Sequence, residues 1–464
     1  MKNYLKQVTM CFALLVVISC TKEDLPTNNE EINTSNSTKK ITKAHGFAEN
    51  DMVMYWNEKT ELVLGAPMQQ PTRARFFAII QIAVHDALNS IKPKYERFAM
   101  NKKEQFADPD AAVASAAYWA IKGLNRQGTF ALALETWYSE SLATIPDGES
   151  KNLGIALGKK SAEVIIANRA DDGYVQMLSP QMQASPTPLD GDEPGEFRSP
   201  IMIIGGVLTY LNPPVKRIPM WGTLMKPYVI ESNEQFRPEG PYAVTSADYT
   251  IDYNEVKTKG ARVNATRTDA ETSMARFWSE NRPSIIWNNL TQRAIETKKM
   301  DAWKTARLLA LVHVSLAETV NTGLNAMYHF YYWRPETAIR LAATDGNPNT
   351  DADADWLPFL TEVPNSSPTP PQPGYPSSFT GYGGATTEVL RLFFASDQTN
   401  IDLTSATLAD TTMHFTSFEQ IARENSLGVI YTGWEFRKSA LDGEEMGKQI
   451  ANYVFNHQFL EIQE

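Results

Sequence analysis

The strongest constraint on the fold is a series of helical segments that carry apolar residues on more than one face. In residues 77–89, Phe-Ala-Ile-Ile-Gln-Ile-Ala-Val-His-Asp-Ala-Leu-Asn, little of the helix circumference is polar. A helix of this kind has to be covered by other helices. Further segments with helical pattern occur at 111–124, 128–142, 151–168, 246–278, 304–332, 381–394 and 418–455. The sequence therefore predicts an all-α fold, built as a large helical bundle.

Two Pro-rich stretches interrupt this pattern, at about 179–241 and at 345–376. No helical period survives in the first stretch, and we expect both to be long loops packed on the bundle. The sequence contains no internal repeat of fixed period. Its 464 residues are enough for two or three domains of about 150 residues. The helical pattern instead favours one domain over residues 46–464.

Composition limits the classes of function. Hydrophobic residues make up 42% and charged residues 21% of the chain, as in ordinary soluble globular proteins. The formal net charge of -11 argues against a general nucleic-acid binder, because phosphate backbones favour a basic surface. Two cysteines cannot build a disulfide framework, so burial has to stabilise the fold.

The N-terminus predicts export. Lys2 and Lys6 precede an apolar run at 11–18, which is shorter than the roughly 20 residues of a membrane-spanning helix. We interpret residues 1–19 as a signal peptide. Residues 17–20, Val-Ile-Ser-Cys, resemble a bacterial lipobox, which implies cleavage before Cys20 and lipidation of its sulfur. An ordinary secretory signal with a coincidental cysteine is the alternative.

Residues 20–45 are expected to form a lipidated cysteine followed by a flexible tether, because they are polar and contain few apolar anchors. The Lys-Glu-Asp sequence at 22–24 is similar to the acidic tag that routes some Gram-negative lipoproteins to the cell surface. We therefore predict a cell-envelope protein, lipid-anchored in the outer membrane and exposed at the surface if this tag is functional.

Local motifs do not predict a metal site. Six histidines occur, without His-x-x-x-His or Cys-x-x-Cys spacing. Asp351, Asp353 and Asp355 alternate in a loop, but the Gly and the terminal Glu of an EF-hand are missing, which favours a solvated acidic loop over calcium binding. The Gly-rich stretch 381–384 opens a helix. It predicts either an anion site or close packing between helices.

Four short motifs carry a family resemblance. They are Trp-Arg-Pro-Glu-Thr-Ala-Ile-Arg at 333–340, Asp-Gly-Asn-Pro at 345–348, Tyr-Pro-Ser-Ser-Phe at 375–379 and Ile-Tyr-Thr-Gly-Trp-Glu-Phe-Arg at 430–437. In this order they resemble the bacterial vanadium-dependent haloperoxidases, which share a superfamily with the type 2 phosphatidic acid phosphatases. Weaker similarity extends upstream over nearly all of the mature chain. The resemblance implies a helical bundle with an oxyanion site between its central helices.

The residues expected at that oxyanion site are only partly present. The family has a Lys seven residues before the Arg of the Arg-Pro pair, and Met327 stands in its place, while Arg334 matches the Arg. The family's Pro-Ser-Gly-His becomes Pro-Ser-Ser-Phe at 376–379. Ser377 is retained, Ser378 replaces the Gly, and Phe379 replaces the acid-base His.

The last motif departs further from the family. An Arg and a His six residues apart fall on Val429 and Glu435. In the family that His coordinates vanadium or attacks phosphorus. Of the charged and nucleophilic set, only Arg334 and Ser377 remain. Opposite charges about 4 Å apart attract by about 4 kcal/mol at an effective dielectric of about 20. We therefore expect Glu435 to contact Arg334, and we expect no cofactor, although vanadate is the cofactor that the family implies.

The other histidines do not predict a rescue of this site. His329 stands where the family itself often has a His, His85 beside Asp86 favours a buried core histidine, and nothing ties His414 to Ser377. Tyr332, Trp333, Tyr431 and Trp434 are expected as core aromatics or as the wall of an apolar pocket.

Three functional interpretations remain open. The first is a haloperoxidase-like lipoprotein without redox or phosphatase activity, which serves as a binding or assembly component for an apolar ligand or a surface protein. The second is a repurposed enzyme in which Glu435 acts as general acid or base on an apolar substrate, as in isomerisation or cyclisation. The third is a haloperoxidase or phosphatase with a rearranged site. A homodimer also stays open, because members of the family often associate.

Overall fold

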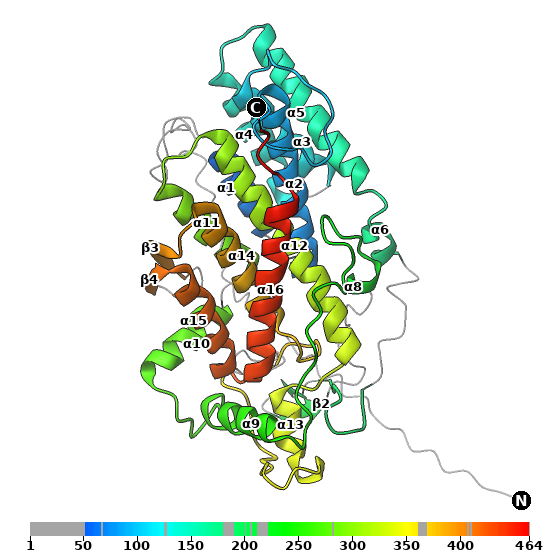
Figure 1. The fold of residues 1–464 in the computed structure, drawn as a ribbon, viewed down its shortest axis with the longest axis vertical. Coiled ribbons are helices and arrows are strands. Elements are labelled where there is room, and N and C mark those ends of the chain that lie inside the picture. The colour runs from blue at the N-terminus through cyan, green and yellow to red at the C-terminus, as the bar shows by residue number, and fades with distance from the viewer. Residues whose placement is uncertain are drawn as a thin grey trace, which may run out of the picture.

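The computed structural model describes residues 52–463 apart from 66–67, 125–127, 180–189, 200, 205–206, 211–220, 281–282, 361–368, 406–407 and 409–410. The described chain is mainly helical and forms an elongated bundle, which confirms the predicted all-α class (Figure 1). The predicted signal peptide and tether, residues 1–45, lie outside the described residues.

The N-terminal helices build one end of the bundle, at the top of Figure 1. They are α1 (Met52–Gly65), α2 (Gln70–Ile91), α3 (Pro109–Gly123), α4 (Ala131–Ala143) with a preceding 3-10 turn at Gly128–Phe130, and α5 (Glu149–Asn168). The start of α3 follows from local chemistry, because Asp108 accepts a hydrogen bond from the Ala111 amide and Pro109 opens the helix. As predicted, α2 is buried over nearly its whole surface.

The longest described helix, α12 (Ala302–Phe330), runs along the middle of the bundle. Its 29 residues correspond to about 43 Å at about 1.5 Å per residue. Asp301 caps its first turn, and Tyr331 ends it in the left-handed conformation with a φ of 49°. This helix packs on α2 at one end and on α14 and α16 at the other, so it connects the two halves of the molecule.

The C-terminal helices build the other half. They are α10 (Asp269–Glu280), α11 (Pro283–Glu296), α14 (Ser378–Phe394), α15 (Phe418–Tyr431) and α16 (Arg437–His457). The closest packing is between α14 and α16, where the backbones approach through glycines. A Cβ atom on Gly384 would lie 2.1 Å from the carbonyl oxygen of Glu444. The close-packing interpretation of the Gly-rich stretch 381–384 is therefore confirmed.

The single predicted segment 418–455 is wrong in one respect, because the structure divides it into α15 and α16. Gly433 lies between the two helices with a φ of 82°, a value that interrupts the helix. The resulting turn carries Glu435. The lower end of the bundle in Figure 1 is formed by α9 (Ala247–Lys259) and α13 (Pro335–Leu341), which is followed by a 3-10 turn at Ala342–Thr344.

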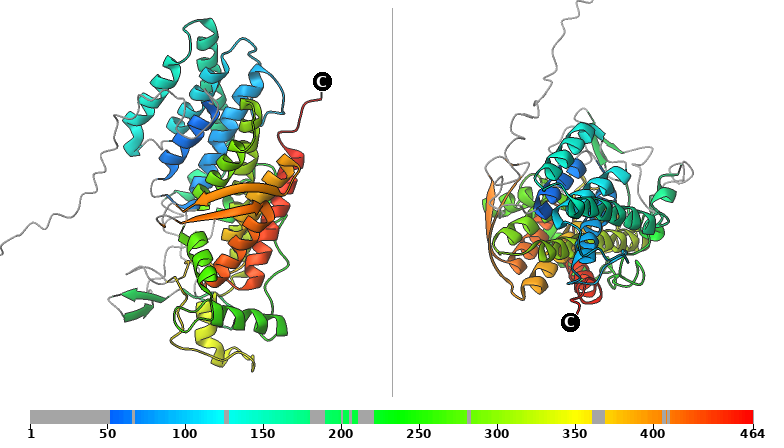
Figure 2. Two further views of the ribbon diagram at one scale, coloured as in Figure 1. Left: turned by 90° about the vertical axis from the view of Figure 1, so that its left-hand side faces the viewer. Right: turned by 90° about the horizontal axis from the view of Figure 1, so that it is seen from above.

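Two small hairpins were not predicted. Strands β1 (Ile201–Ile204) and β2 (Val207–Tyr210) lie within the first Pro-rich stretch, together with the short helix α8 (Trp221–Leu224); α6 (Tyr174–Met177) precedes that stretch. Strands β3 (Gln398–Thr404) and β4 (Thr412–Ser417) pair antiparallel, with Ile401 opposite Phe415, and lie against the helices (Figure 2). In the second Pro-rich stretch, no helix occurs among the residues that the structure describes.

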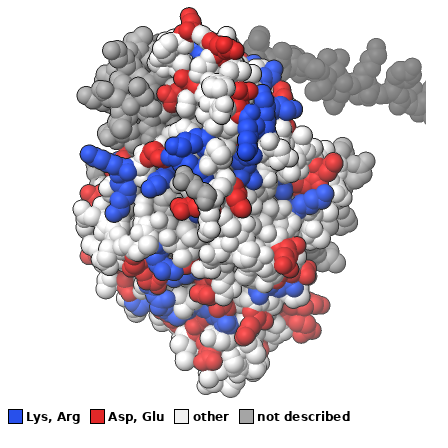
Figure 3. Space-filling model, turned by 45° about the horizontal axis from the view of Figure 1, so that its top comes forward, with Lys and Arg blue, Asp and Glu red and all other residues white. Residues whose placement is uncertain are grey.

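Most buried apolar residues form one large core along α2, α3, α12 and α14. A smaller aromatic cluster at the lower end contains Trp333, Tyr375 and Phe436, and a third cluster contains Val429 and Ile430. On the face seen in Figure 3, Lys and Arg side chains are interspersed with Asp and Glu. None of the helices in the described ranges combines the length and apolarity that a membrane span requires.

Candidate functional site

Three segments that are distant in sequence meet in the lower half of the bundle. Arg334 is the residue before α13, and residues 372–377 lead into α14. The third segment, residues 432–439, consists of the turn from α15 to α16 and the first residues of α16. Ser377 donates its backbone N–H to the carbonyl of Ser439 at 3.1 Å, and the Ser439 hydroxyl contacts the carbonyl of Gly374 at 2.8 Å. These bonds fix the second segment against the third.

The Arg334 guanidinium is buried and bonded on several sides. Its Nε donates to the carbonyl of Gln372 at 2.7 Å, Nη2 donates to that of Pro373 at 3.3 Å, and Nη1 donates to that of Trp434 at 3.0 Å. Nη1 also donates to Oε1 of Glu435 at 3.0 Å. The contact expected from the sequence between Arg334 and Glu435 is therefore present in the structure.

Glu435 is fully buried, with a side-chain exposure of 0% against 2% for Arg334. Its second oxygen, Oε2, is 2.9 Å from the hydroxyl of Ser439. Burial raises the pKa of Glu435 above its ordinary value, and Arg334, Ser439 and Ser377 act in the opposite direction. The carboxyl group thus lies between a cation and a hydroxyl, away from solvent.

Glycine is required at two positions around this pair. A Cβ on Gly374 would lie 2.6 Å from the carbonyl oxygen of Trp333 and 3.0 Å from Cγ of Arg334. A Cβ on Gly433 would lie 2.5 Å from the carbonyl oxygen of Gly260. The contacts with the two carbonyl oxygens, at 2.6 and 2.5 Å, are shorter than a Cβ atom tolerates. These glycines therefore let the backbone close around Arg334 and Glu435.

The Ser377 hydroxyl is also buried beside this pair. Ser377 is 0% exposed, and its Oγ makes no hydrogen bond of standard geometry with the described residues. It still lies near enough to the Glu435 carboxyl to lower its pKa. Ser377 is therefore a buried hydroxyl group next to the ion pair.

The remaining positions suggested by the family motif are apolar or peripheral. Met327 is 2% exposed and packs in the main core, whereas Val429 is fully buried in the third cluster. Phe379 packs against that same cluster and against the ring of Trp434, with ring centroids 5.8 Å apart. Ser378 is half-buried in the first turn of α14. These side chains add no charge to the surroundings of Arg334.

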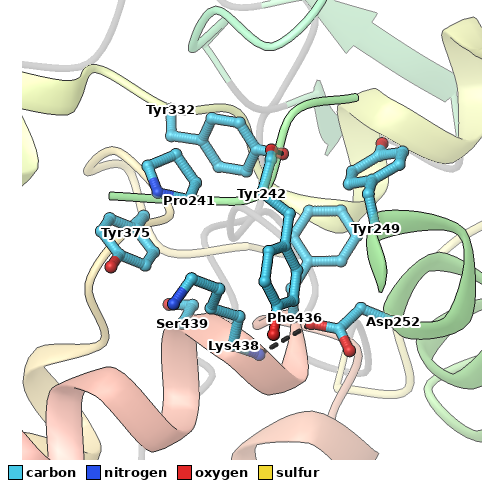
Figure 4. A pocket seen from close by; sticks show the side chains of 9 residues that line it. All are labelled: Pro241, Tyr242, Tyr249, Asp252, Tyr332, Tyr375, Phe436, Lys438 and Ser439. Atoms are coloured by element: carbon cyan, nitrogen blue, oxygen red, sulfur yellow. Dashed lines mark hydrogen bonds between the residues drawn. The ribbon is translucent and has the colours of Figure 1, made fainter. Parts of the chain in front are cut away.

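A small cavity is lined in part by Ser439, the residue whose hydroxyl contacts Glu435 (Figure 4). Its volume is about 10 Å³, room for about one water molecule. The lining is mainly aromatic and consists of Pro241, Tyr242, Tyr249, Asp252, Tyr332, Tyr375, Phe436, Lys438 and Ser439. Tyr332 thus lines a pocket as well as belonging to the core. Burial raises the pKa of Asp252 to about 6.

The histidines that the structure describes have other surroundings. His85 is buried against Asp86, with Nδ1 and Oδ1 3.1 Å apart, which confirms a core histidine. His313 is buried in α12 and contacts Asn288. His414 pairs with Asp402 on the neighbouring strand, and His329 is exposed. Asp351, Asp353 and Asp355 are exposed, as expected for a solvated loop.

Sequence reasoning missed part of the site. Ser439 carries the only sequence signal, since it follows Glu435 by four residues at the start of a helix, a spacing that brings side chains together. The three carbonyl groups around Arg334 and the tyrosine cavity have no such signal. They depend on how distant loops fold over the bundle.

Comparisons with known proteins agree with this fold. A profile of the VCPO second helical-bundle domain matches residues 307–463. The chain is 24% identical over 408 residues to the vanadium chloroperoxidase of Curvularia inaequalis, and this match covers 74% of the chain but 65% of that protein's length.

Solved structures show the same architecture. The crystal structure described as that of the first bacterial vanadium-dependent iodoperoxidase superposes with a TM-score of 0.70 at 21% identity, over 89% of this chain and 98% of the other. A bacterial vanadium-dependent chloroperoxidase in its apo form superposes with a TM-score of 0.64 at 14% identity, over 84% and 94% of the two chains. Together, the matches in sequence and the likenesses in fold support the vanadium haloperoxidase superfamily for this chain.

Proposed function

We propose that this protein is a cell-envelope lipoprotein in which an internal ion pair has replaced the oxyanion site of the superfamily. In this proposal it acts as a binding or assembly protein and does not oxidise halides or hydrolyse phosphate esters. The observation that carries the proposal is the contact of Glu435 with Arg334, at 3.0 Å between buried side chains. The Glu435 carboxyl group thus occupies the place beside the Arg334 guanidinium that an oxyanion would need.

The surroundings of Arg334 do not fit a vanadate or phosphate ion. An oxyanion taken out of water needs several positive charges or hydrogen-bond donors. Here the guanidinium already donates to three carbonyls and to Glu435. A second anion at this place would also be repelled by the carboxylate. The imidazole that coordinates vanadium in the family has no counterpart, because Glu435 occupies that position in the motif.

The envelope location rests on the sequence alone. The signal-like run, the lipobox-like residues 17–20 and the acidic sequence at 22–24 support a lipid anchor on Cys20 in the outer membrane. The partner in this proposal is a surface protein or an apolar ligand. The acidic net charge of -11 disfavours nucleic acid.

A second candidate is an enzyme that uses Glu435 as general acid or base. The Ser439 hydroxyl favours it, because it contacts two acceptors, Oε2 of Glu435 and the carbonyl of Gly374, at 2.9 and 2.8 Å. A hydroxyl has one proton to donate, so both contacts are satisfied when Glu435 itself carries a proton. Turnover of an apolar substrate that disappears in Glu435→Gln would support this candidate. A rearranged haloperoxidase would instead show halide-dependent bromination with added vanadate.

Calorimetry with vanadate and with phosphate tests the main proposal. The soluble chain starting at residue 46 is titrated at neutral pH beside a variant that restores the family's side chains by Met327→Lys, Phe379→His, Val429→Arg and Glu435→His. We expect no heat of binding for the unchanged protein and measurable binding for the restored one. Micromolar binding of vanadate by the unchanged protein would contradict the proposal. Because four buried substitutions can impair folding, circular dichroism of the variant and the single variant Glu435→His serve as controls.

A further inference from the structure

A groove runs along one edge of the β3–β4 hairpin, on the opposite side of β3 from β4. Three adjoining cavities of about 400, 300 and 400 Å³ make it up. The first and second share Thr297 and Asn400, while the first and third share Arg293, Glu296 and Thr404. We call this continuous depression the β3 groove. Its other wall is formed by α11 and, at one end, by α1.

The groove borders the backbone edge of β3 and not just one of the two faces of the strand. Successive side chains of a strand point to opposite sides, so a cavity on one face touches alternate residues. Every residue of β3 from 398 to 404 lines one of the three cavities. This uninterrupted lining is expected when the backbone edge itself borders the cavity.

This edge is not used inside the described protein. Strand β3 pairs with β4 alone, and no backbone hydrogen bond joins β3 to any other described segment. Seven residues at about 3.3 Å each give an edge of roughly 23 Å. An unpaired edge of this length is a template for a strand from another chain.

The walls of the groove have a defined chemistry. Leu62, which is 48% exposed, provides an apolar contact, whereas the side chains of Ile401 and Leu403 are buried in the main core at 2% exposure each. Acidic side chains outnumber basic ones; the acidic ones are Glu58, Glu61, Glu296 and Asp402, and the basic ones are Arg293 and Lys298. Arg293 is already paired with Glu296 at 2.8 Å. Asp402 contacts His414 at 2.7 Å, and burial raises the pKa of Glu61 to about 7. The excess of four acidic over two basic side chains therefore gives the groove a modest negative charge at neutral pH.

We propose that the β3 groove binds an extended, basic segment of a partner protein, which adds a strand to the free edge of β3. Strand addition provides affinity through main-chain hydrogen bonds, and alternate side chains provide specificity. Lysine or arginine side chains of the partner meet the acidic rim, while alternate β-branched residues contact Leu62. This inference rests on the proposed binding function and gives that function a surface and a class of partner.

Blocked seven-residue peptides test this proposal with the soluble chain. The probe alternates Lys with Val, and its counterpart has Glu in place of Lys. We expect saturable binding of the basic peptide, about tenfold tighter than that of the acidic peptide, together with slower amide hydrogen exchange in residues 398–404. Methylation of alternate peptide nitrogens is expected to abolish binding in one register and to be tolerated in the other. Equal loss in both registers would contradict strand addition.

Charge reversal locates the site. Asp402 is exposed in the groove, so Asp402→Lys is expected to weaken the basic peptide about fivefold. The matched control, Glu163→Lys in the exposed part of α5, is expected to leave affinity unchanged. No binding of the basic peptide, or concentration-dependent dimerisation that protects β3, would overturn the inference. Neither result affects the oxyanion test, since vanadate binding is measured at Arg334.

Discussion

Arg334 and Glu435 form a buried ion pair at the point where three segments of the chain meet. The pair is buried at 2% and 0% exposure, and the guanidinium also holds the carbonyls of Gln372, Pro373 and Trp434. Removing one member of a buried pair leaves an uncompensated charge and typically costs about 3–5 kcal/mol. The pair therefore joins three loops of the chain.

Glu336, two residues after Arg334, predicts a pH-dependent stability. It is 2% exposed, and neither carboxyl oxygen makes a hydrogen bond of standard geometry with the described residues. Burial raises its pKa from 4.5 to about 8, against the opposing effects of Arg340 and Thr369. The folded protein keeps this proton between these two pH values, whereas the unfolded chain has lost it. The stabilisation that protonated Glu336 gives the folded state is thus complete below pH 4.5. The free energy of unfolding then declines by about 5 kcal/mol as the pH rises to about 8.

Urea unfolding of wild type and Glu336→Gln at several pH values measures this effect. The amide cannot ionise, so the free energy of unfolding of the wild type should fall relative to that of the variant between pH 4.5 and about 8. Glu163→Gln, at an exposed position of α5, provides a control for the loss of a carboxyl that is not buried. A difference between wild type and Glu336→Gln that stays constant over this range would contradict the prediction.

At the scale of residues, the sequence predicted which residues form the site but not which hydrogen bonds they make. Motif spacing predicted that Arg334 and Glu435 would meet, because it fixes which positions of the fold they occupy. It could not predict Ser439 between two acceptors, because that contact depends on the turn around Gly374. Nor could it predict that Met327 packs in the main core while Val429 lies in another cluster.

At the scale of elements, the packing of α14 on α16 depends on glycines and predicts a sharp difference between two similar substitutions. In Gly447→Ala the new Cβ would lie 2.0 Å from the carbonyl oxygen of Gly381, so one helix has to move. In Gly323→Ala the nearest atoms are at 3.5 and 3.8 Å, which is ordinary contact. We expect Gly447→Ala to lower the free energy of unfolding by about 3 kcal/mol. Gly323→Ala should raise it by about 0.5–1 kcal/mol, since alanine favours a helix interior.

Chemical denaturation of both variants tests this prediction, and each variant serves as the control for the other. Both replace a buried helical glycine by alanine, so intrinsic helix propensity favours both equally. Equal effects of the two substitutions would mean that α14 and α16 can separate without loss. The close approach of their backbones would then contribute little to stability.

Helices were predicted better than hairpins, for physical reasons. Long segments such as α2 and α12 carry a strong apolar pattern that several contacting helices reinforce. Strands β3 and β4 are short and lie on helices instead of in a large sheet, so their pattern is weak. The break between α15 and α16 needs the left-handed conformation of Gly433, and a glycine in a helical sequence does not by itself show that the helix ends there.

At the scale of the whole molecule, fold and chemistry are separate properties. The chain superposes on a vanadium-dependent iodoperoxidase with a TM-score of 0.70 at 21% identity. One fold supports many functions, so the likeness describes architecture and the site has to be interpreted from its own residues.

The position of the whole molecule in the cell gives the last prediction, which rests on the sequence at 17–24. If the sulfur of Cys20 carries lipid, the full-length protein should partition into the detergent phase of Triton X-114 and sediment with outer membranes. Cys20→Ala should move it to the aqueous phase, because acyl chains contribute about 0.8 kcal/mol per buried CH₂ and the protein then lacks them. Replacing Lys22, Glu23 and Asp24 by alanine should leave the protein in the membrane but protect it from protease added to intact cells. Membrane association that persists in Cys20→Ala would contradict the lipid anchor, and unchanged protease access in the triple variant would contradict the surface tag.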